Sequence, residues 1–548
     1  MSSTYLVVVQ LTEMNSSKTN FDVVVVGAGF AGMYLLIKLR ALGLRTCVIE
    51  KAEDVGGTWY WNRYPGARCD IESVQYSYSF DEALQQEWDW SERYAGQQEI
   101  LCYANHVADR YELRKDIRFG TTVEQLLYQE EQSNWSVVTR HGDNEPSYLQ
   151  ARFCILATGC LSQPSYPDFP GLDSFNGSVY HTADWPRQEV DFSGQSVAII
   201  GTGSSGIQTS VEIAKQAEHL FVLQRTPNYV VPAANHKLTA EQLGEIKQNY
   251  PELRAQAKLA RNGVAQKIVK HSALSVSQQT RDDDFWQRWN QGGLTFAGVF
   301  GDLLLNADAN ETAAEFVRQR IRDIVHDEQT ASALSPQSTF ACKRLCVSSH
   351  YYEMFNRNNV SLIDISEQGI EMISEQGLSL GNQDLEVDSI VFATGFDAMT
   401  GAISKMEIVG REDLSLKQKW QNGPQTYLGL MVAGFPNLFT VTGPGSPSVL
   451  SNVLGSIEFH VDYISDCLEA VVTQGKYHIE TTLEAEQAWA NEVASVVDKT
   501  LYRTCNSWYL GSNISDKPRL FMPYPGVPTY TARCREIQSD NFTGFNFS

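Results

Sequence analysis

Four short apolar runs that lead into glycine dominate the hydrophobic pattern of this 548-residue chain. Two of them, Phe21–Gly32 (FDVVVVGAGFAG) and Ser196–Gly206 (SVAIIGTGSSG), pass from β-branched residues into glycines and then into helical periodicity. The other two, Phe153–Gly159 (FCILATG) and Ser389–Phe396 (SIVFATGF), are typical of buried strands that return to each unit. The pattern therefore predicts an α/β fold with two Rossmann-like, doubly wound β-α-β units.

The chain between and beyond these runs has a different pattern. Strand signals give way to helical windows such as 240–260 and 312–331, which predicts a helical insertion. We expect the C-terminal part of the chain to pack back on the first unit. The predicted organisation is an N-terminal extension (1–19), a first domain (20–155 and 390–548), a second domain (156–232 and 336–389) and the insertion (233–335).

The first glycine cluster has the spacing of a dinucleotide-binding turn. Gly27, Gly29 and Gly32 follow a strand and open a helix, whose N-terminal N–H groups attract phosphate. Phe30 lies between the second and third glycines. The next strand ends in Glu50, a carboxylate placed to accept hydrogen bonds from ribose hydroxyls. This domain is therefore expected to bind a dinucleotide whose ribose is not phosphorylated.

The second glycine cluster lacks that carboxylate. The segment Gly201-Thr202-Gly203-Ser204-Ser205-Gly206 is followed by a strand that ends in Gln224-Arg225-Thr226. A guanidinium at this position pairs with a 2′-phosphate, which a carboxylate would repel. A solvated surface charge is the alternative reading of Arg225. Two such sites in one chain predict electron transfer from NADPH to a second dinucleotide cofactor, for which FAD is the usual choice.

The charge composition of the chain limits which macromolecules it can bind. The chain carries 43 Lys and Arg against 65 Asp and Glu, a net charge of −22. Nucleic acid and anionic membranes need clustered cations, so neither is expected as a partner, whereas a small anion held by local positive groups is allowed. No run approaches the roughly 18 apolar residues of a membrane-spanning helix. The sequence carries no signal for an oligomeric state.

Ten cysteines are too sparse for a disulfide scaffold, and none forms a CxxC pair. Neither a zinc site nor a dithiol redox centre is favoured, and no metal is expected. A reducing, cytoplasmic compartment is the simpler interpretation. With dithiol and metal acceptors disfavoured, dioxygen becomes the expected electron acceptor.

Five segments between the glycine clusters and beyond them form a specific set. The segment FNGSVYHTADWP holds Phe175, Gly177, His181 and Trp185 and lies just before the second glycine cluster. The other four are GGTWYWNRYPGARCDIES (56–73), CKRLCVSSHYYEMFNRNNV (342–360), TGPGSPSVLSN (442–452) and SWYLGSNISDKPRLFMPY (507–524). Together they resemble the type I Baeyer–Villiger monooxygenases, the group of cyclohexanone, phenylacetone and steroid monooxygenases, with FNGSVYHTADWP as the most specific match. The resemblance runs from about residue 20 to the C-terminus.

The resemblance implies an NADPH- and O2-dependent enzyme that converts cyclic or aryl ketones to lactones or esters. In that family a flavin C4a-peroxide attacks the ketone carbonyl, and a fixed cation stabilises the anionic species. Arg344 matches the catalytic arginine and Asp70 the carboxylate that orients it, although a structural ion pair would look similar. Lys343 matches the lysine that joins Arg225 and Thr226 at the 2′-phosphate; a solvated lysine is the alternative.

The remaining matched residues divide into conformational and pocket roles. We expect His181 to link domain rotation to nicotinamide movement rather than to transfer a proton, with Trp185 packing beside it. Trp508 matches a tryptophan that contacts NADP, but an ordinary core tryptophan is an equal alternative. Trp59, Trp61 and Tyr64 are expected as walls of the cofactor pocket, although core packing explains them nearly as well. Gly57, Thr58 and Tyr76 are also expected to bind a cofactor, and the expected substrate lining is Val449 and Leu450.

Two other functions stay open. The first is oxygenation at sulfur or nitrogen, which the same flavin chemistry performs. The second is a non-catalytic NADP sensor on a flavoprotein scaffold, which would give Arg344 and Asp70 little reason to lie together.

Overall fold

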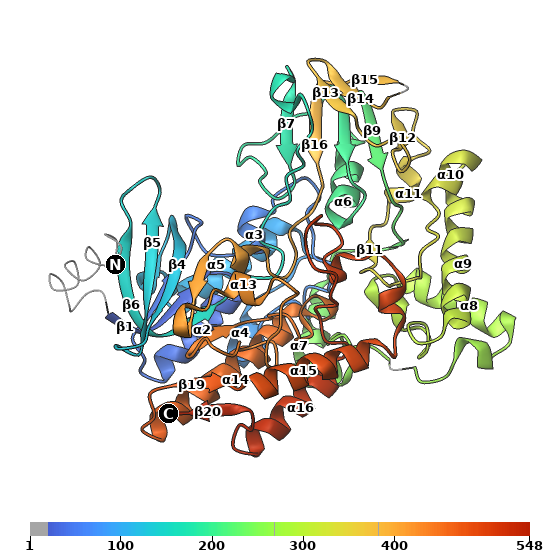
Figure 1. The fold of residues 1–548 in the computed structure, drawn as a ribbon. Helices are drawn as coiled ribbons and strands as arrows, with labels where there is room; N and C mark the ends of the chain where they lie inside the picture. The colour runs from blue at the N-terminus through green and yellow to red at the C-terminus, as the bar shows by residue number, and fades with distance from the viewer. Residues whose placement is uncertain (1–19, 268, 382) are drawn as a thin grey trace.

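The computed structural model describes residues 20–267, 269–381 and 383–548. The predicted extension 1–19 lies outside this range. Two parallel β-α-β units form the centre of the fold, with the first on the left and the second at the top of Figure 1.

The first sheet has eight strands in the order β17-β4-β5-β6-β1-β2-β3, with β18 also paired to β6. β1 pairs in parallel with β2 and β6, as the two predicted strands require. The strands are β1 (Asn20–Val26), β2 (Thr46–Ile49), β3 (Ile117–Arg118), β4 (Thr121–Gln129), β5 (Asn134–His141), β6 (Ser147–Leu156), β17 (Glu407–Val409) and β18 (Leu438–Thr440).

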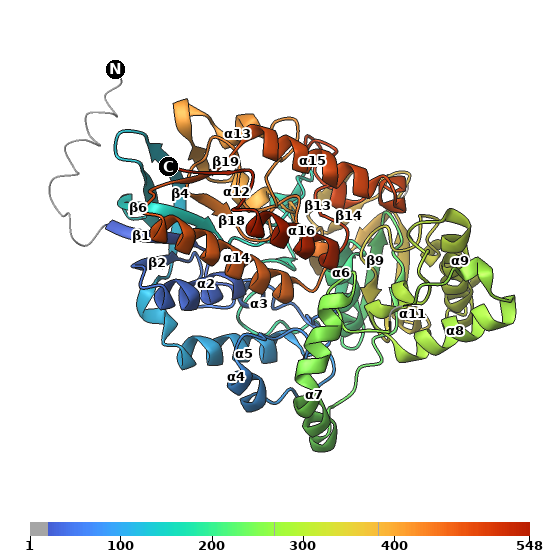
Figure 2. The same cartoon turned by 90° about the horizontal axis from the view of Figure 1, so that it is seen from below.

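Helices from both ends of the chain cover this sheet. α2 (Phe30–Ala41) follows β1 and packs against α14 (Val453–Thr473), so the C-terminal region lies against the first unit (Figure 2). The others are α3 (Thr58–Trp61), α4 (Glu82–Glu87), α5 (Gln97–Arg110), α12 (Gly401–Ser404), α13 (Leu416–Lys419), α15 (Leu483–Val497) and α16 (Val527–Ser539), with the short pair β19 (Ile479–Thr481) and β20 (Phe545–Phe547).

The second sheet is entirely parallel, in the order β12-β9-β8-β16-β7. The predicted boundary at residues 389/390 falls inside β16, which pairs with β8, so the second unit extends to the end of that strand. Its elements are β7 (Ser178–His181), β8 (Ser196–Ile200), α6 (Ser204–Ile213), β9 (His219–Gln224), α11 (Tyr351–Met354), β12 (Val360–Asp364) and β16 (Ser389–Phe392), with the small sheet β13 (Met372–Ser374), β14 (Gly377–Ser379) and β15 (Asp384–Glu386).

The helical insertion divides between the two domains. α7 (Ala240–Leu259) lies against α4 and α16 of the first domain, and its Tyr250 belongs to that core. α8 (Gln278–Gln291), α9 (Ala307–Ile324) and α10 (Glu328–Leu334) instead extend the core of the second domain, at the right of Figure 1. Two short parallel strands flank the insertion in the sequence, β10 (Val230–Val231) before it and β11 (Cys346–Val347) after it, and they pair with each other.

No helix in the described ranges is both long and apolar enough to cross a lipid bilayer.

Candidate functional site

One cavity of about 1920 Å³ is lined by the first two glycines of each glycine cluster. The carboxyl ends of β1, β2, β8 and β9 open into it through Val26, Ile49, Ile200 and Leu223, which is where doubly wound sheets bind ligands. The predicted residues that line it are Gly27, Gly29, Phe30, Glu50, Gly57, Thr58, Trp59, Asp70, Tyr76, Gly201, Thr202, Gly203, Ser204, Ser205, Arg225, Thr226, Lys343, Arg344, Val449 and Trp508.

The glycines in the first cluster have distinct geometric tasks. Gly27 has φ +107°, and a Cβ there would lie 2.6 Å from the Ala157 carbonyl oxygen. A Cβ at Gly32 would lie 1.8 Å from the oxygen of Gly27, so this glycine lets α2 approach β1 and does not face the cavity. Gly29 caps α2 without a side-chain hydrogen bond, which leaves the helix N–H groups available to a phosphate.

The second cluster repeats this geometry. Gly201 has φ +111°, and a Cβ at Gly206 would meet the Gly201 oxygen at 2.0 Å. Gly203 caps α6 without a side-chain hydrogen bond, and the space around its missing Cβ is open to 4 Å. Both helix starts therefore fit a pyrophosphate.

Glu50 is held by the backbone at the end of β2. Its two carboxylate oxygens accept hydrogen bonds from Ala28 N (2.6 Å) and Ala52 N (2.7 Å). Burial raises the pKa of Glu50, and these backbone bonds oppose the rise. The carboxylate is thus fixed at the cavity wall, where each oxygen keeps a second lone pair for a ribose hydroxyl.

Lys343 and Arg225 lie close together and both line the cavity. Burial lowers the pKa of Lys343, and the neighbouring Arg225 cation lowers it further. Arg225 is exposed, and Thr226 accepts a hydrogen bond from Thr202 Oγ1 through its carbonyl (3.1 Å). Two adjacent cations repel each other, and an anion bound between them offsets that repulsion. Such a pair of cations is what a 2′-phosphate needs from its binding site.

Arg344 and Asp70 form a bidentate ion pair. Arg344 Nε donates to Asp70 Oδ2 at 2.5 Å and Nη2 donates to Oδ1 at 2.8 Å, while Nη1 donates to the Val449 carbonyl at 2.8 Å. Burial by itself would lower the pKa of Arg344, but the Asp70 carboxylate outweighs it and raises that pKa. The guanidinium is therefore a fixed, permanent cation at the cavity wall.

His181 does not reach the cavity. It is buried in β7, where Nε2 lies 3.1 Å from Thr394 Oγ1 and Nδ1 accepts from Ala183 N at 3.1 Å. Burial lowers the pKa of His181, so the ring is neutral. Because Thr394 lines the cavity, the histidine contacts the site only indirectly.

The other signature residues are packing groups. Trp185 is buried and stacks on Tyr180 at 5.3 Å. A Cβ at Gly177 would clash with the Asp388 oxygen and the Phe175 ring. The four named residues of this motif thus lie outside the cavity lining, whereas Ala183 and Asp184 of the same motif line it.

Aromatic side chains form part of the cavity wall. Trp59 and Tyr76 are buried, and the indole Nε1 donates to the tyrosine hydroxyl at 3.1 Å. Trp508 opens a short 3-10 helix (Trp508–Leu510) and is half-buried.

Leu450 lines a separate cavity of about 220 Å³ on the other side of Arg344. Arg344 and Val449 border both cavities, and Phe300 and Tyr502 add apolar surface to the smaller one.

Within the described residues, no group of three or more His, Cys, Asp and Glu side chains is arranged to hold a metal ion.

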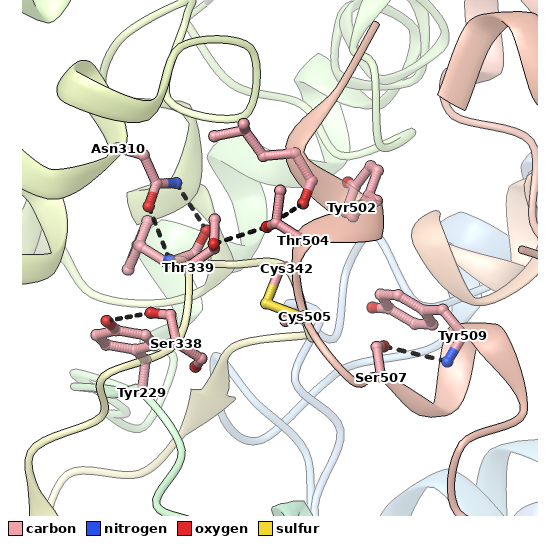
Figure 3. The surroundings of a disulfide bond; sticks show 12 residues. Tyr229, Asn310, Ser338, Thr339, Cys342, Tyr502, Thr504, Cys505, Ser507 and Tyr509 are labelled. Atoms are coloured by element: carbon pink, nitrogen blue, oxygen red, sulfur yellow. Dashed lines mark hydrogen bonds between the residues drawn. A yellow bond between two sulfur atoms is a disulfide. The ribbon is translucent and has the colours of Figure 1, made fainter. Parts of the chain in front are cut away.

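Sequence reasoning missed three features of the site. The Val449 carbonyl bond to Arg344 has no sequence signal. Gln208 of α6 links the domains by accepting from Tyr64 Oη (3.0 Å) and donating to the Arg68 carbonyl (3.1 Å). The cysteine spacings did not indicate that Cys342 and Cys505, 163 residues apart in sequence, are joined by a disulfide (Figure 3).

The chain is similar to known flavoprotein oxygenases over nearly its whole length. Residues 24–290 match the pyridine nucleotide-disulphide oxidoreductase family. The chain is 38% identical to phenazine N-monooxygenase from Lysobacter antibioticus over 97% of this chain and 98% of that protein. It is also 38% identical to cyclohexanone 1,2-monooxygenase from an Acinetobacter species, over 97% of each protein. A solved structure of oxidised steroid monooxygenase bound to NADP has a TM-score of 0.92 and 46% identity, covering 96% of this chain and 99% of that one.

Proposed function

We propose how this chain works from the premise that it belongs to the Baeyer–Villiger monooxygenase family, as its near full-length similarity to members of that family shows. The resemblance noted in the sequence is thereby confirmed. The chain is an oxidoreductase that uses FAD, NADPH and dioxygen to convert ketones to lactones or esters. The residue roles, the substrate class and the cellular location are our proposals.

The cavity fits both cofactors. We assign FAD to the first cluster, where Glu50 favours an unphosphorylated ribose, and NADPH to the second, where Arg225 and Lys343 face the 2′-phosphate. When bound, FAD supplies the reduced flavin that activates dioxygen.

Arg344 carries the chemical proposal. Its guanidinium stabilises the negative charge that develops on the ketone oxygen as the carbonyl is attacked. Asp70 and the Val449 carbonyl hold three of its N–H groups, so the cation does not reorganise during the reaction. The bidentate Arg344–Asp70 pair, placed at the boundary of the cofactor cavity and the smaller apolar one, is the observation on which this proposal rests.

The smaller cavity is the proposed ketone site. Its volume of about 220 Å³ is below the range of about 300–1,000 Å³ usual for drug-sized ligands, which favours a small cyclic or aryl ketone. Val449 and Leu450 then line the substrate, and Arg344 faces its carbonyl.

A panel of cyclic and aryl ketones tests this function. With NADPH and oxygen, the purified enzyme is expected to give products one oxygen atom heavier than the ketone, identified as lactones or esters by mass spectrometry. Absence of such products across the panel, with FAD bound and NADPH oxidised, would contradict it.

Oxygenation at nitrogen or sulfur is the second candidate, favoured by the similarity to phenazine N-monooxygenase. A substrate that carries both a ketone and a sulfide separates the two activities through its product ratio.

We propose a cytoplasmic location because eight cysteines, within the part of the chain that the structure describes, are free thiols.

A further inference from the structure

The Cys342–Cys505 disulfide (Figure 3) joins two chain segments whose residues line the cofactor cavity. Cys342 directly precedes Lys343 and Arg344, which we assign to NADPH and to the ketone. Cys505 lies in the 501–513 segment, which contributes Trp508 to the lining of the same cavity. The bond therefore ties the segment that bears the two cations to the segment that bears Trp508.

Little regular structure holds the 501–513 segment. It consists of two short 3-10 helices, Leu501–Thr504 and Trp508–Leu510, and the residues between and after them. Beside the disulfide, Thr504 Oγ1 lies 2.7 Å from Thr339 Oγ1, and both side chains meet solvent (Figure 3). A hydrogen bond at such a position is worth only about 1 kcal/mol to the folded state, so the covalent bond is the stronger tie.

The two sulfur atoms differ in access. Cys342 is buried, with 1% of its surface exposed, whereas Cys505 is half-buried between the exposed Thr504 and Asn506. A thiolate arriving from solvent can therefore attack the Cys505 sulfur and displace Cys342.

We propose that Cys342 and Cys505 form a redox-modification site for small dithiols and disulfides. The state of this site sets how firmly the 501–513 segment is held over bound NADP. The functional part of this proposal rests on the NADPH-binding role assigned above to Lys343 and Trp508.

The exchange is balanced in both directions. A dithiol attacks Cys505, forms a mixed disulfide and releases Cys342 as a thiolate; its second thiol then displaces Cys505. The protein gains two electrons and two protons and becomes a dithiol, while the reagent becomes a cyclic disulfide. The reverse reaction restores the Cys342–Cys505 bond.

The pattern of cysteine use favours a responsive bond over a scaffold. Eight cysteines in the described ranges are free, including the exposed Cys102, so this chain does not depend on a network of disulfides. In a reducing compartment such as the cytoplasm proposed above, an isolated disulfide is usually catalytic or redox-sensing. Its place at the cofactor cavity identifies NADP retention as the property that it controls.

Thiol counting and NADP⁺ release test the proposal on the FAD-loaded enzyme. In oxidised dithiothreitol we expect eight titratable thiols after denaturation, and in reduced dithiothreitol all ten. Stopped-flow release of NADP⁺ should be about fivefold or more faster from the reduced enzyme, the lower bound for sites that are coupled.

Variants identify the bond responsible. Cys505→Ser and Cys342→Ser should release NADP⁺ at the reduced rate in both buffers, with an unchanged FAD spectrum as evidence of folding. Cys102→Ser is the matched control, expected to keep the full response with one thiol fewer in each state. Ten thiols in the oxidising buffer, or a Cys505→Ser variant that releases NADP⁺ as slowly as the oxidised parent, would overturn the proposal. Neither readout uses a ketone, so a failure of the proposed oxygenation would be seen separately.

Discussion

At the scale of single residues, the proposed chemistry depends on a guanidinium that its partners fix in place. Arg344 and Asp70 are 274 residues apart in sequence, and nothing in their local patterns pairs them. Only the family resemblance suggested the contact, and the structure supplies its geometry. The Val449 carbonyl, the third partner, has no sequence signal because any residue offers a carbonyl.

Asp70→Asn tests the positioning of Arg344. The amide keeps the shape but loses the charge and one acceptor, so ketone oxygenation should fall about tenfold or more, since a hydrogen bond to a charged group is worth about 1.5–3 kcal/mol. Flavin reduction by NADPH should change little. Glu112→Gln, which breaks the exposed pair with Lys115, is the control and should leave both rates unchanged. Equal losses in reduction and oxygenation would assign Asp70 to a structural role.

Arg225→Ala tests the reading of the 2′-phosphate. KM for NADPH should rise about tenfold or more, because a charge-assisted bond to phosphate is lost. KM for NADH should change little. Steady-state assays of flavin reduction with the two coenzymes measure both values, and the NADH assay serves as the control. A matched rise for both coenzymes would show that Arg225 does not contact the phosphate.

At the scale of elements, the sequence predicted what local patterns determine. The strand–glycine–helix units appear as expected, because a positive φ at Gly27 or Gly201 and the close approach at Gly32 or Gly206 leave few alternatives. The division of the insertion between two cores was not predictable, since helical periodicity does not indicate which partner a helix packs against.

A buried histidine on α14 gives a pH prediction at this scale. His460 Nδ1 accepts from Thr442 N at 2.9 Å, Nε2 lies 2.8 Å from Tyr530 Oη, and burial lowers the pKa of His460 to about 3. At a pH between this value and 6.5, the ordinary pKa of histidine, His460 binds a proton more readily in the unfolded chain than in the folded protein. The histidine's contribution to stability is therefore complete above about pH 6.5 and is lost as pH falls, by about 1 kcal/mol per unit.

Urea unfolding of the parent and His460→Gln at pH 7 and pH 5 measures this effect. Glutamine keeps a polar side chain but does not titrate, so the parent should lose more stability than the variant on acidification. Identical losses in the two proteins would show that His460 is protonated in the folded state.

At the scale of the whole molecule, the disulfide closes a loop of 163 residues. The sequence could not reveal it, because spacing rules detect only neighbouring cysteines, and this pair is assembled by the packing of the C-terminal segment against the second domain. Restricting the unfolded chain over such a loop stabilises the fold by up to about 5 kcal/mol.

Differential scanning calorimetry without reductant checks the stabilisation. Cys342→Ser should melt several degrees below the parent, and Cys102→Ser should melt with the parent. Addition of dithiothreitol should lower the melting temperature of the parent toward that of Cys342→Ser. An unchanged melting temperature in Cys342→Ser would contradict a stabilising bond.

The proposed role of Arg344 is to direct oxygen to a ketone carbonyl. A single turnover of the NADPH-reduced enzyme with ¹⁸O₂ and a cyclic ketone, comparing the parent with Arg344→Ala, tests it most directly. The parent should place one ¹⁸O atom in the ring of the lactone, whereas Arg344→Ala should bind FAD, accept electrons from NADPH and consume oxygen without labelled lactone. Labelled lactone at the parental rate from Arg344→Ala would contradict the account.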